Sequence, residues 1–362
     1  MKKVMTILGT RPEIIKLSPI IPLLEQSFEH ILVHTGQHYD YEMDKVFFDE
    51  LKLPAPTYNL KVGSCEPAVQ IALIMEKLDE IITKEKPDMI IVQGDTNSTL
   101  AGALTAVKKN IPLIHIEAGC RSFDKKQPEE INRIVADHCA DILFAPDEAA
   151  TENLKKERIV LSRIVSVGNT SFDACVRNKR LANTNILNTH KLKKNNYILV
   201  TIHRAESTEN ENLRNIVKAL NTLSQDNTLV FPIHPRTRKA IEENKIVIDK
   251  NIKLIEPQPY LNFIELLSNC RLCITDSGGI QEEAIVFNIP CIIPRDRTEW
   301  MRLVDAGKNS LAGTNTESIV EKTRTLLKTE VYERVRSIKI PYANGASEKI
   351  INYLKNYDSQ NR

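Results

Sequence analysis

The chain has 362 residues, more than a single hydrophobic core usually serves, so we expect two domains. Its formal net charge is +2 and its charged residues are spread along the chain, which argues against nucleic acid or an anionic membrane as a partner. Several of the seven cysteines lie in apolar runs, where they act as small hydrophobic residues, so structural disulfides are not expected.

The N-terminal apolar run is short and opens directly into Gly9-Thr10-Arg11-Pro12, so we interpret it as a first strand and not as a signal peptide. No apolar segment approaches the roughly 18 residues needed to span a bilayer. We therefore expect a cytoplasmic protein with no membrane partner.

Short apolar, β-branched runs alternate with longer amphipathic stretches, a pattern typical of parallel sheets covered by helices. The first half predicts strands over residues 4–8, 31–34, 89–92, 113–116 and 142–145. After a polar stretch the alternation restarts, with strands predicted over residues 197–202, 228–233, 252–255, 272–275 and 291–294. The fold class is therefore α/β, with two Rossmann-like β/α/β domains facing a central cleft.

The polar stretch between residues 183 and 196 lacks periodicity and is interpreted as the linker. We expect an N-terminal Rossmann-like domain over residues 1–183 and a C-terminal Rossmann-like domain over residues 196–345. Residues 346–362 are expected to form a C-terminal helix of unassigned role.

Carboxylates follow two neighbouring apolar runs, in Gln93-Gly94-Asp95-Thr96 and in His115-Ile116-Glu117-Ala118-Gly119. Parallel strands end at one rim of their sheet, so Asp95 and Glu117 are expected to face the same cavity as acid–base groups. Glu129 is a third candidate. The alternative for Asp95 is a structural role as an N-cap, and the alternative for Glu129 is that of an ordinary acidic residue in the first turn of a helix. A structural role is less expected for Glu117, because burying a carboxylate without a function costs free energy.

Anion-binding features occur after a strand in each half. Arg11 lies in a strand-to-helix turn with Pro12 suited to the first helical position, although the turn is not GxGxxG and does not indicate a dinucleotide. In the second half Ser277, Gly278 and Gly279 open a helix that can receive a diphosphate, with Glu283 one turn further as a ribose ligand. An ordinary structural turn is the alternative at both places.

Histidines end two strands of the second half. His203 is followed by Arg204, and such a pair can bind phosphate or donate a proton to a leaving oxygen; His234 is a weaker candidate for the same role. His115 and Glu117 could suggest a metal, but the chain has no HExxH and no aspartate cluster, so we expect no catalytic metal. No Gly-x-Ser-x-Gly elbow is present, which argues against a serine hydrolase.

Taken together, the motifs resemble those of the non-hydrolysing UDP-N-acetylglucosamine 2-epimerase family. They are Gly9-Thr10-Arg11-Pro12-Glu13, Gly94-Asp95-Thr96, His115-Ile116-Glu117-Ala118-Gly119, Pro128-Glu129-Glu130-Ile131-Asn132-Arg133, His203-Arg204 and Asp276-Ser277-Gly278-Gly279-Ile280-Gln281-Glu282-Glu283. The resemblance implies the two-domain GT-B fold and a homodimer without a cofactor. It also implies interconversion of UDP-N-acetylglucosamine and UDP-N-acetylmannosamine for surface polysaccharides.

The resemblance assigns roles to individual residues. It implies that the catalytic residues are Lys16, Asp95, Glu117, Glu129 and His203. It implies that Arg11, Ser277, Gly278, Gly279 and Glu283 bind UDP. We add Arg133, Arg204 and His234 as further candidates for binding the substrate or UDP.

Two segments depart from the family pattern. Arg295-Asp296-Arg297-Thr298-Glu299-Trp300 looks more like the branch acting on UDP-2,3-diacetamido-2,3-dideoxyglucuronic acid, whose carboxylate Arg297 could pair with; a surface arginine is the alternative. Gln37-His38-Tyr39-Asp40 replaces the family's Gln-His-Arg segment, which makes an allosteric UDP-sugar site unexpected here.

Three alternative functions stay open for the protein: a GT-B glycosyltransferase, a hydrolysing epimerase and a non-enzymatic UDP-sugar sensor.

Overall fold

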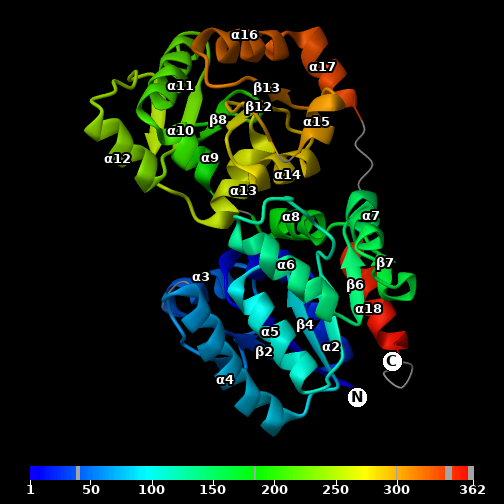
Figure 1. Ribbon diagram of the computed structural model, residues 1–362. Helices are drawn as coiled ribbons and strands as arrows, with labels where there is room; N and C mark the ends of the chain where they lie inside the picture. Colours follow the sequence, from blue (N-terminus) through cyan, green and yellow to red (C-terminus); the bar gives the residue numbers. More distant parts are fainter. Residues whose placement is uncertain (38–40, 183–184, 299, 339–344, 358–362) are drawn as a thin grey trace. The chain divides into compact units, whose positions relative to one another are not determined.

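The computed structural model describes residues 1–37, 41–182, 185–298, 300–338 and 345–357. The chain forms two compact units, one from Met1–Ala174 with Tyr342–Arg362 and the other from Cys175–Pro341 (Figure 1). The first unit ends inside helix α8 (Thr170–Leu181), earlier than the polar stretch predicted as the linker.

The first unit contains a seven-stranded parallel sheet in the order β3-β2-β1-β4-β5-β6-β7. All five strands predicted in this half are present, and β3 and β7 are additional edge strands. The strands are β1 (Lys3–Leu8), β2 (Glu29–His34), β3 (Tyr58–Asn59), β4 (Met89–Gln93), β5 (Leu113–Ile116), β6 (Ile142–Ala145) and β7 (Ile164–Ser166).

Helices cover this sheet, which explains why its central strands are apolar at nearly every position. On one face, residues of α4 and α5 pack against Met5, Ile7, Ile90 and Val92 in a single core. The helices of the unit are α1 (Arg11–Leu17), α2 (Ile21–Ser27), α3 (Tyr41–Glu50), α4 (Pro67–Glu85), α5 (Asn97–Lys108), α6 (Pro128–Cys139), α7 (Glu148–Lys156), α8 and α18 (Ala346–Asn356), with a 3-10 turn at Leu161–Arg163.

The C-terminal helix α18 returns to the first unit. The backbone N–H groups of Gly345 and Ser347 donate to the Asp173 carboxylate at 2.8 and 2.7 Å, which anchors the start of the helix. Tyr353 then packs edge-on against Phe144 of β6, with 5.5 Å between ring centroids. The helix expected from the sequence thus has a structural role in the first unit.

The second unit has a six-stranded parallel sheet in the order β10-β9-β8-β11-β12-β13. The five strands predicted here are also present. The strands are β8 (Ile198–Thr201), β9 (Leu229–Pro232), β10 (Ile252–Ile255), β11 (Leu272–Thr275), β12 (Cys291–Ile293) and β13 (Ser310–Leu311). The helices are α9 (Ile186–Thr189), α10 (Ala205–Thr208), α11 (Asn210–Leu223), α12 (Pro235–Glu243), α13 (Tyr260–Asn269), α14 (Gly278–Val286), α15 (Met301–Asp305), α16 (Thr316–Leu327) and α17 (Thr329–Ser337).

The segment interpreted as a linker is in part packed against the second unit. Ile186 and Leu187 of α9 and the following Leu192 are buried in one core with Tyr197 and Leu199. The few apolar residues of this stretch lie among many polar ones, which conceals the packing in the sequence. The described residues of the stretch, 185–196, belong to the second unit.

Within the part of the chain that the structure describes, every helix is too short or too polar to cross a bilayer.

Candidate functional site

The two predicted carboxylates follow adjacent strands at one rim of the first sheet. Gln93 at the end of β4 is in register with Ile116 at the end of β5, so Asp95 and Glu117 leave the sheet side by side. Gly94, Glu117 and Gly119 have φ values of +73°, +70° and +80°. A left-handed backbone costs about 1–2 kcal/mol for a residue with a side chain, and such strain concentrates at functional sites. The backbone of Glu117 therefore marks this rim as a candidate active site.

Glu117 is held by two donors from neighbouring elements. Lys16 of α1 places Nζ 2.7 and 2.6 Å from the two carboxylate oxygens, and Nε2 of Gln93 donates to Oε2 at 2.7 Å. The side chains of Lys16 and Glu117 are 26% and 23% exposed, so the ion pair lies where a ligand can reach it. The structure thus brings two of the predicted catalytic residues into direct contact.

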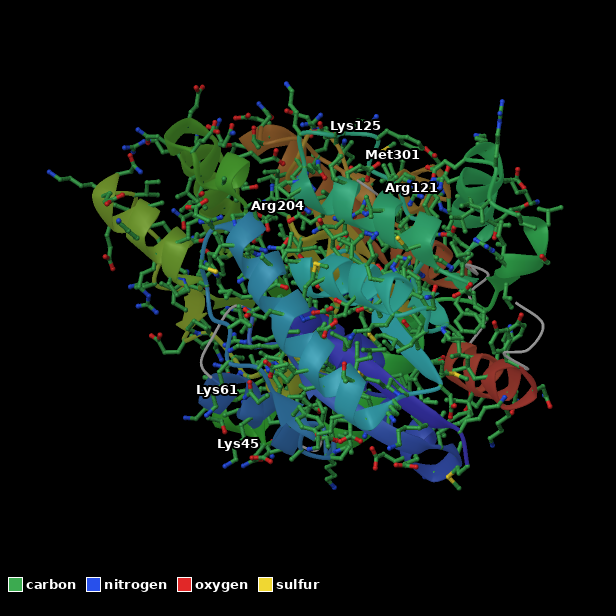
Figure 2. The ribbon with its side chains drawn as sticks, turned by 60° about the horizontal axis from the view of Figure 1, so that its bottom comes forward. Lys45, Lys61, Arg121, Lys125, Arg204 and Met301 are labelled. Atoms are coloured by element: carbon green, nitrogen blue, oxygen red, sulfur yellow. The ribbon has the colours of Figure 1, made fainter. Side chains whose placement is uncertain are left out.

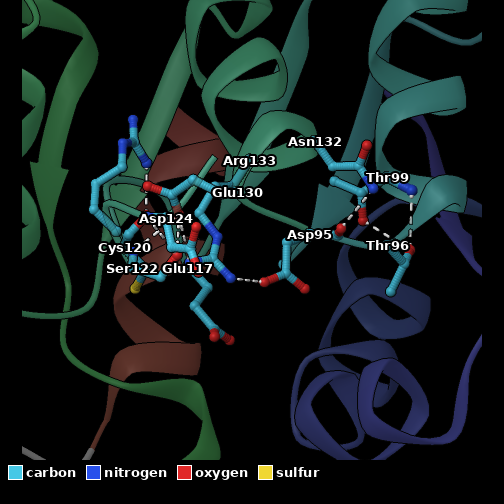
Figure 3. A network of polar contacts seen from close by, with 12 residues as sticks. Asp95, Thr96, Thr99, Glu117, Cys120, Ser122, Asp124, Glu130, Asn132 and Arg133 are labelled. Carbon is cyan, nitrogen blue, oxygen red and sulfur yellow. Dashed lines mark hydrogen bonds and ion pairs between the residues drawn. The ribbon is translucent and has the colours of Figure 1, made fainter. Parts of the chain in front are cut away.

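Asp95 is paired with Arg133 of α6 (Figure 3). Arg133 also donates to Oε2 of Glu130 at 3.0 Å, and Nδ2 of Asn132 donates to the Asp95 carbonyl at 2.9 Å. The N-cap of α5 is Thr96, whose hydroxyl accepts from the Thr99 N–H, so the capping alternative for Asp95 is wrong. Asp95 is instead oriented by a cation.

The adjacent acids of α6 have different environments. Glu129 is exposed, whereas Glu130 is buried and accepts from the N–H groups of Ser122 and Phe123, each at 2.9 Å. Burial alone would raise the pKa of Glu130, but these bonds and the charge of Arg133 lower it. Glu130 therefore orders the loop before α6. No hydrogen bond or ion pair joins Glu129 to Asp95 or Glu117, so the predicted catalytic role of Glu129 stays a prediction.

The predicted anion site after β1 is occupied by the protein itself. The buried Glu13 accepts from the Gly9 N–H at 3.0 Å, from the Thr10 hydroxyl at 2.8 Å and from the Thr96 hydroxyl at 3.0 Å. Burial raises the pKa of Glu13. Arg11 lies with its guanidinium 5.0 Å from the centre of the Phe47 ring. The backbone turn is thus stabilised by an internal carboxylate, and Arg11 remains the ligand-binding candidate of this segment.

Asp276 organises the rim of the second sheet. This fully buried residue follows β11, and its Oδ2 accepts from the N–H groups of His203 and Arg204 at 2.9 and 2.8 Å. Its Oδ1 lies 3.5 Å from Nδ1 of His203. The carboxylate therefore fixes the segment after β8 that carries His203 and Arg204, whose side chain is labelled in Figure 2.

His234 lies beside His203, with 5.6 Å between ring centroids. Nδ1 of His234 accepts from the Arg236 N–H at 3.1 Å and caps α12, and the Arg236 guanidinium donates to the His203 carbonyl at 3.1 Å. Burial, with the nearby His203 and Arg236, lowers the pKa of His234. His234 thus has a structural role as a cap in addition to its place at the rim.

The glycine-rich start of α14 leaves space for a ligand. Ser277 is the N-cap residue but its side chain makes no capping bond, and a Cβ at Gly279 would meet no atom within 4 Å. Glu283, one turn further, accepts from the Tyr260 hydroxyl at 3.0 Å. First-turn N–H groups favour an anion, so this helix start suits a phosphate.

The sequence analysis missed the roles of several residues at these rims. Gln93 and Asn132 hold Glu117 and Asp95, while Glu13, Glu130 and Asp276 each accept from backbone N–H groups of a neighbouring turn. The role of Gln93 could have been predicted from the sequence, because Gln93 is a polar residue at the end of an apolar run. Among the described residues, no group of three His, Cys, Asp or Glu side chains is placed to hold a metal ion.

Two parallel Rossmann-like sheets, with a carboxylate–lysine pair on one rim and a glycine-rich helix start on the other, define a class of α/β enzymes of the GT-B type. The family model for UDP-N-acetylglucosamine 2-epimerase matches residues 23–355. The chain belongs to this family, whose members are epimerases and hence isomerases.

The relatives are similar over nearly the whole chain. The UDP-N-acetylglucosamine 2-epimerase of Methanocaldococcus jannaschii is 44% identical, with 97% of this chain and 98% of that protein covered. The UDP-2,3-diacetamido-2,3-dideoxy-D-glucuronate 2-epimerase of Pseudomonas aeruginosa is 40% identical, with 97% and 99% covered.

A crystal structure of the Methanocaldococcus jannaschii enzyme in complex with UDP-GlcNAc and UDP matches with a TM-score of 0.82 at 44% identity. It covers 98% of this chain and 99% of that chain. The enzyme of Neisseria meningitidis bound to UDP-GlcNAc matches with a TM-score of 0.85 at 34% identity, covering 97% and 99%.

Proposed function

We propose that this protein is a non-hydrolysing UDP-N-acetylglucosamine 2-epimerase. The observation that carries the proposal is the Glu117 carboxylate, held in a left-handed backbone turn by Lys16 and Gln93 next to Asp95. This arrangement supplies partly exposed, oriented carboxylates, which the epimerisation requires. The near full-length similarity to enzymes of this name supports the same substrate.

The chemistry explains the need for more than one acid–base group. C2 of the sugar has no adjacent carbonyl, so its proton is too weakly acidic for direct removal. The C1–O bond breaks first, UDP leaves with the bonding electrons, and a carboxylate removes the C2 proton from the resulting oxocarbenium ion to give 2-acetamidoglucal. UDP then adds back to C1 while C2 is reprotonated on the other face. Two faces of C2 require two proton-transfer groups.

We assign these steps to residues of the two rims. Asp95, Glu117 and Glu129 are the proposed acid–base groups, with Lys16 orienting Glu117. His203 and Arg204 are proposed to stabilise the departing diphosphate, with the first-turn N–H groups at Gly278 and Gly279. The remaining UDP-binding assignments are Arg11, Arg133, His234, Ser277 and Glu283.

The second candidate substrate is UDP-2,3-diacetamido-2,3-dideoxyglucuronic acid. The Pseudomonas aeruginosa relative carries this name, and Arg297 is exposed and therefore accessible to the carboxylate of such a sugar. The neighbouring Arg295 is buried and donates through Nε to Glu206 at 2.5 Å, so it is already used within the protein. In the Gln37–Asp40 segment, which makes an allosteric site unexpected, residues 38–40 lie outside the described residues.

Nuclear magnetic resonance (NMR) of the protein with UDP-N-acetylglucosamine in deuterated water tests the proposal. We expect UDP-N-acetylmannosamine with deuterium at C2 and no free sugar, and product formation and exchange at least about 100-fold slower with the Glu117→Gln variant. Free N-acetylmannosamine would indicate the hydrolysing reaction. Absence of both product and exchange would overturn the proposed substrate, and UDP-2,3-diacetamido-2,3-dideoxyglucuronic acid would then be tested as the substrate. Turnover only with an added acceptor would indicate a glycosyltransferase.

We further propose a cytoplasmic homodimer, as the family resemblance implies. Sedimentation equilibrium tests the dimer: the expected mass is twice the 41.1 kDa of the chain, and a single species at the chain mass contradicts it.

A further inference from the structure

A buried histidine lies directly behind the two carboxylate-bearing turns. His115, in β5, has no exposed surface. Its Nδ1 is 2.7 Å from Oδ1 of Asp137 in α6, and its Nε2 is 2.8 Å from the carbonyl oxygen of Gly94, the residue before Asp95. His115 also precedes Glu117 by two positions in the chain. One imidazole thus connects the end of β4, the end of β5 and helix α6.

The hydrogen-bond partners determine the protonation state of this ring. The Gly94 carbonyl can only accept, so Nε2 carries a proton. Asp137 is itself ionised, because its Oδ2 accepts from the Gly119 N–H at 3.0 Å and lies 2.7 Å from the Arg121 guanidinium. An ionised carboxylate also only accepts, so Nδ1 carries a proton as well. A ring with two protonated nitrogens is an imidazolium.

We propose that His115 is a permanently charged positioning residue, whose imidazolium fixes the turns that carry Asp95 and Glu117 and keeps a positive charge behind them. The inference rests on the proposed epimerase function for its catalytic consequence. His115 does not touch the substrate, and its effect is transmitted through the Gly94 carbonyl and the chain segment up to Gly119.

The backbone around the site explains why such a fixed point is useful. Gly94, Glu117 and Gly119 all have positive φ values, so the two turns are held in a conformation that non-glycine residues avoid. The imidazolium binds Gly94 directly, and Asp137 binds the N–H of Gly119. A side chain that merely filled space would not hold both turns.

The charges around His115 are balanced within the network. Asp137 and Arg121 form an ion pair, Arg121 also pairs with Glu157 at 2.7 Å, and Glu117 pairs with Lys16. Burial lowers the pKa of His115, but the Asp137 charge, its hydrogen bond, the Gly94 carbonyl and Glu117 outweigh burial and raise it. The imidazolium is therefore one of the positive charges that balance the carboxylates of this network.

The charged state is measured on the wild-type protein without substrate. Nitrogen-15 NMR of the histidine rings distinguishes an imidazolium, in which both nitrogens resonate as protonated, from a neutral ring. We assign the His115 signal by its loss in the His115→Gln variant, or by its couplings if that variant does not fold. We expect His115 to remain an imidazolium at about pH 7.5, well above the ordinary histidine pKa of about 6.5. A neutral ring at that pH would overturn the proposal.

The catalytic consequence is measured with His115→Gln and a matched control, His30→Gln. His30 also pairs with a carboxylate, Glu25 at 2.7 Å, but lies near the start of β2, away from the carboxylate rim. We expect His115→Gln to lower kcat about 10- to 100-fold while KM changes less than about threefold, because a displaced catalytic group slows the reaction more than it weakens binding. A kcat within twofold of wild type, or a loss confined to KM, would overturn the proposal.

The two readouts separate this inference from the proposed function. If the wild-type protein does not epimerise UDP-N-acetylglucosamine, the proposed function fails, whereas the NMR measurement still decides whether His115 is charged. Urea unfolding of His115→Gln followed by circular dichroism checks that the variant is folded, because His115 lies in the first unit whereas most of the proposed UDP ligands lie in the second.

Discussion

Individual carboxylates at the two rims have two distinct roles. Asp95 and Glu117 face the cations Arg133 and Lys16 and keep part of their surface accessible. Glu13, Glu130 and Asp276 are buried and accept from backbone N–H groups of adjoining turns, which positions the loops of the site. The side-chain types are the same, so burial and partners separate catalytic candidates from structural ones.

Replacing Glu117 by glutamine tests the first role. The amide keeps the shape but loses the charge that Lys16 neutralises, and general acid–base catalysis typically contributes about 10²- to 10⁴-fold to the rate. We expect kcat for UDP-N-acetylglucosamine to fall at least about 100-fold while UDP binding is retained. Steady-state kinetics and calorimetry measure the two quantities.

The control for this variant is Glu152→Gln, because Glu152 is an exposed acid of the same unit that also pairs with a lysine, Lys155 at 2.6 Å. Its activity should equal that of the wild type. If Glu117→Gln retained more than a tenth of the wild-type kcat, Glu117 would not take part in proton transfer.

At the level of secondary-structure elements, the site depends on the turns that follow the strands. Gly119 after β5 has a φ of +80°, and a Cβ there would lie 2.3 Å from the Ala150 carbonyl oxygen. Gly63 has a similar φ of +75°, but a Cβ there would meet nothing within 4 Å. Substitutions at these two glycines therefore distinguish the cost of a left-handed backbone from the cost of a steric clash.

Alanine at these two positions should have unequal effects on stability. Gly63→Ala is expected to lower the free energy of unfolding by about 1 kcal/mol, the cost of a left-handed alanine. Gly119→Ala adds a clash with backbone atoms and should lower it by about 3 kcal/mol. Urea unfolding followed by circular dichroism measures both, and equal losses would show that the contact with Ala150 is relieved without cost.

Asp276 links the ends of β8 and β11 in the second unit. Asp276→Asn removes the charge that two backbone N–H groups bind, and hydrogen bonds to charged groups are worth about 1.5–3 kcal/mol each. We expect a loss of about 2 kcal/mol in unfolding free energy and weaker UDP binding, because His203 and Arg204 are no longer fixed. The exposed Asp226→Asn in the same unit is the control. Unchanged UDP affinity in Asp276→Asn would contradict the positioning role.

The sequence predicted the central elements better than the edges. The strands that form the middle of each sheet were all expected, because strands covered on both faces are nearly continuous apolar runs, and the edge strand β10 was expected as well. The short edge strands β3, β7 and β13 are only partly buried and lack such runs, so hydrophobic pattern did not reveal them. The packing of Leu192 was likewise invisible in a polar stretch.

For the whole molecule, the buried charges predict loss of stability in acid. The pKa values of Glu130 and Asp137 are lowered in the folded protein, against the effect of burial, by their hydrogen bonds and cationic partners. Such groups bind fewer protons when folded, so their stabilisation is present above their ordinary pKa values of about 4 and is lost as the pH falls below them. The raised pKa of Glu13 acts in the opposite direction.

Glu130→Gln measures this contribution. At pH 7 we expect the variant to be less stable than the wild type by about 2 kcal/mol, since a charged acceptor of two N–H groups is lost. The difference should shrink as the pH falls below the ordinary carboxyl pKa of about 4 and Glu130 of the wild type becomes protonated. Urea midpoints across this range give the comparison, and a difference independent of pH would show that Glu130 contributes through shape alone.

The sequence by itself determined the α/β class, ten of the strands that the structure describes, the family and the rims at which Asp95, Glu117, His203 and Ser277 lie, because strand patterns and strand-end motifs are local in the chain. Only the tertiary structure decided which partners those residues have. Lys16 and Glu117 are 101 positions apart, and His203 and Asp276 are 73 apart. The tertiary structure also decided that Glu130 is buried beside an exposed Glu129, that α18 belongs to the first unit, and that His115 is charged. Each of these depends on contacts between distant segments, whose burial and hydrogen bonds no local pattern encodes.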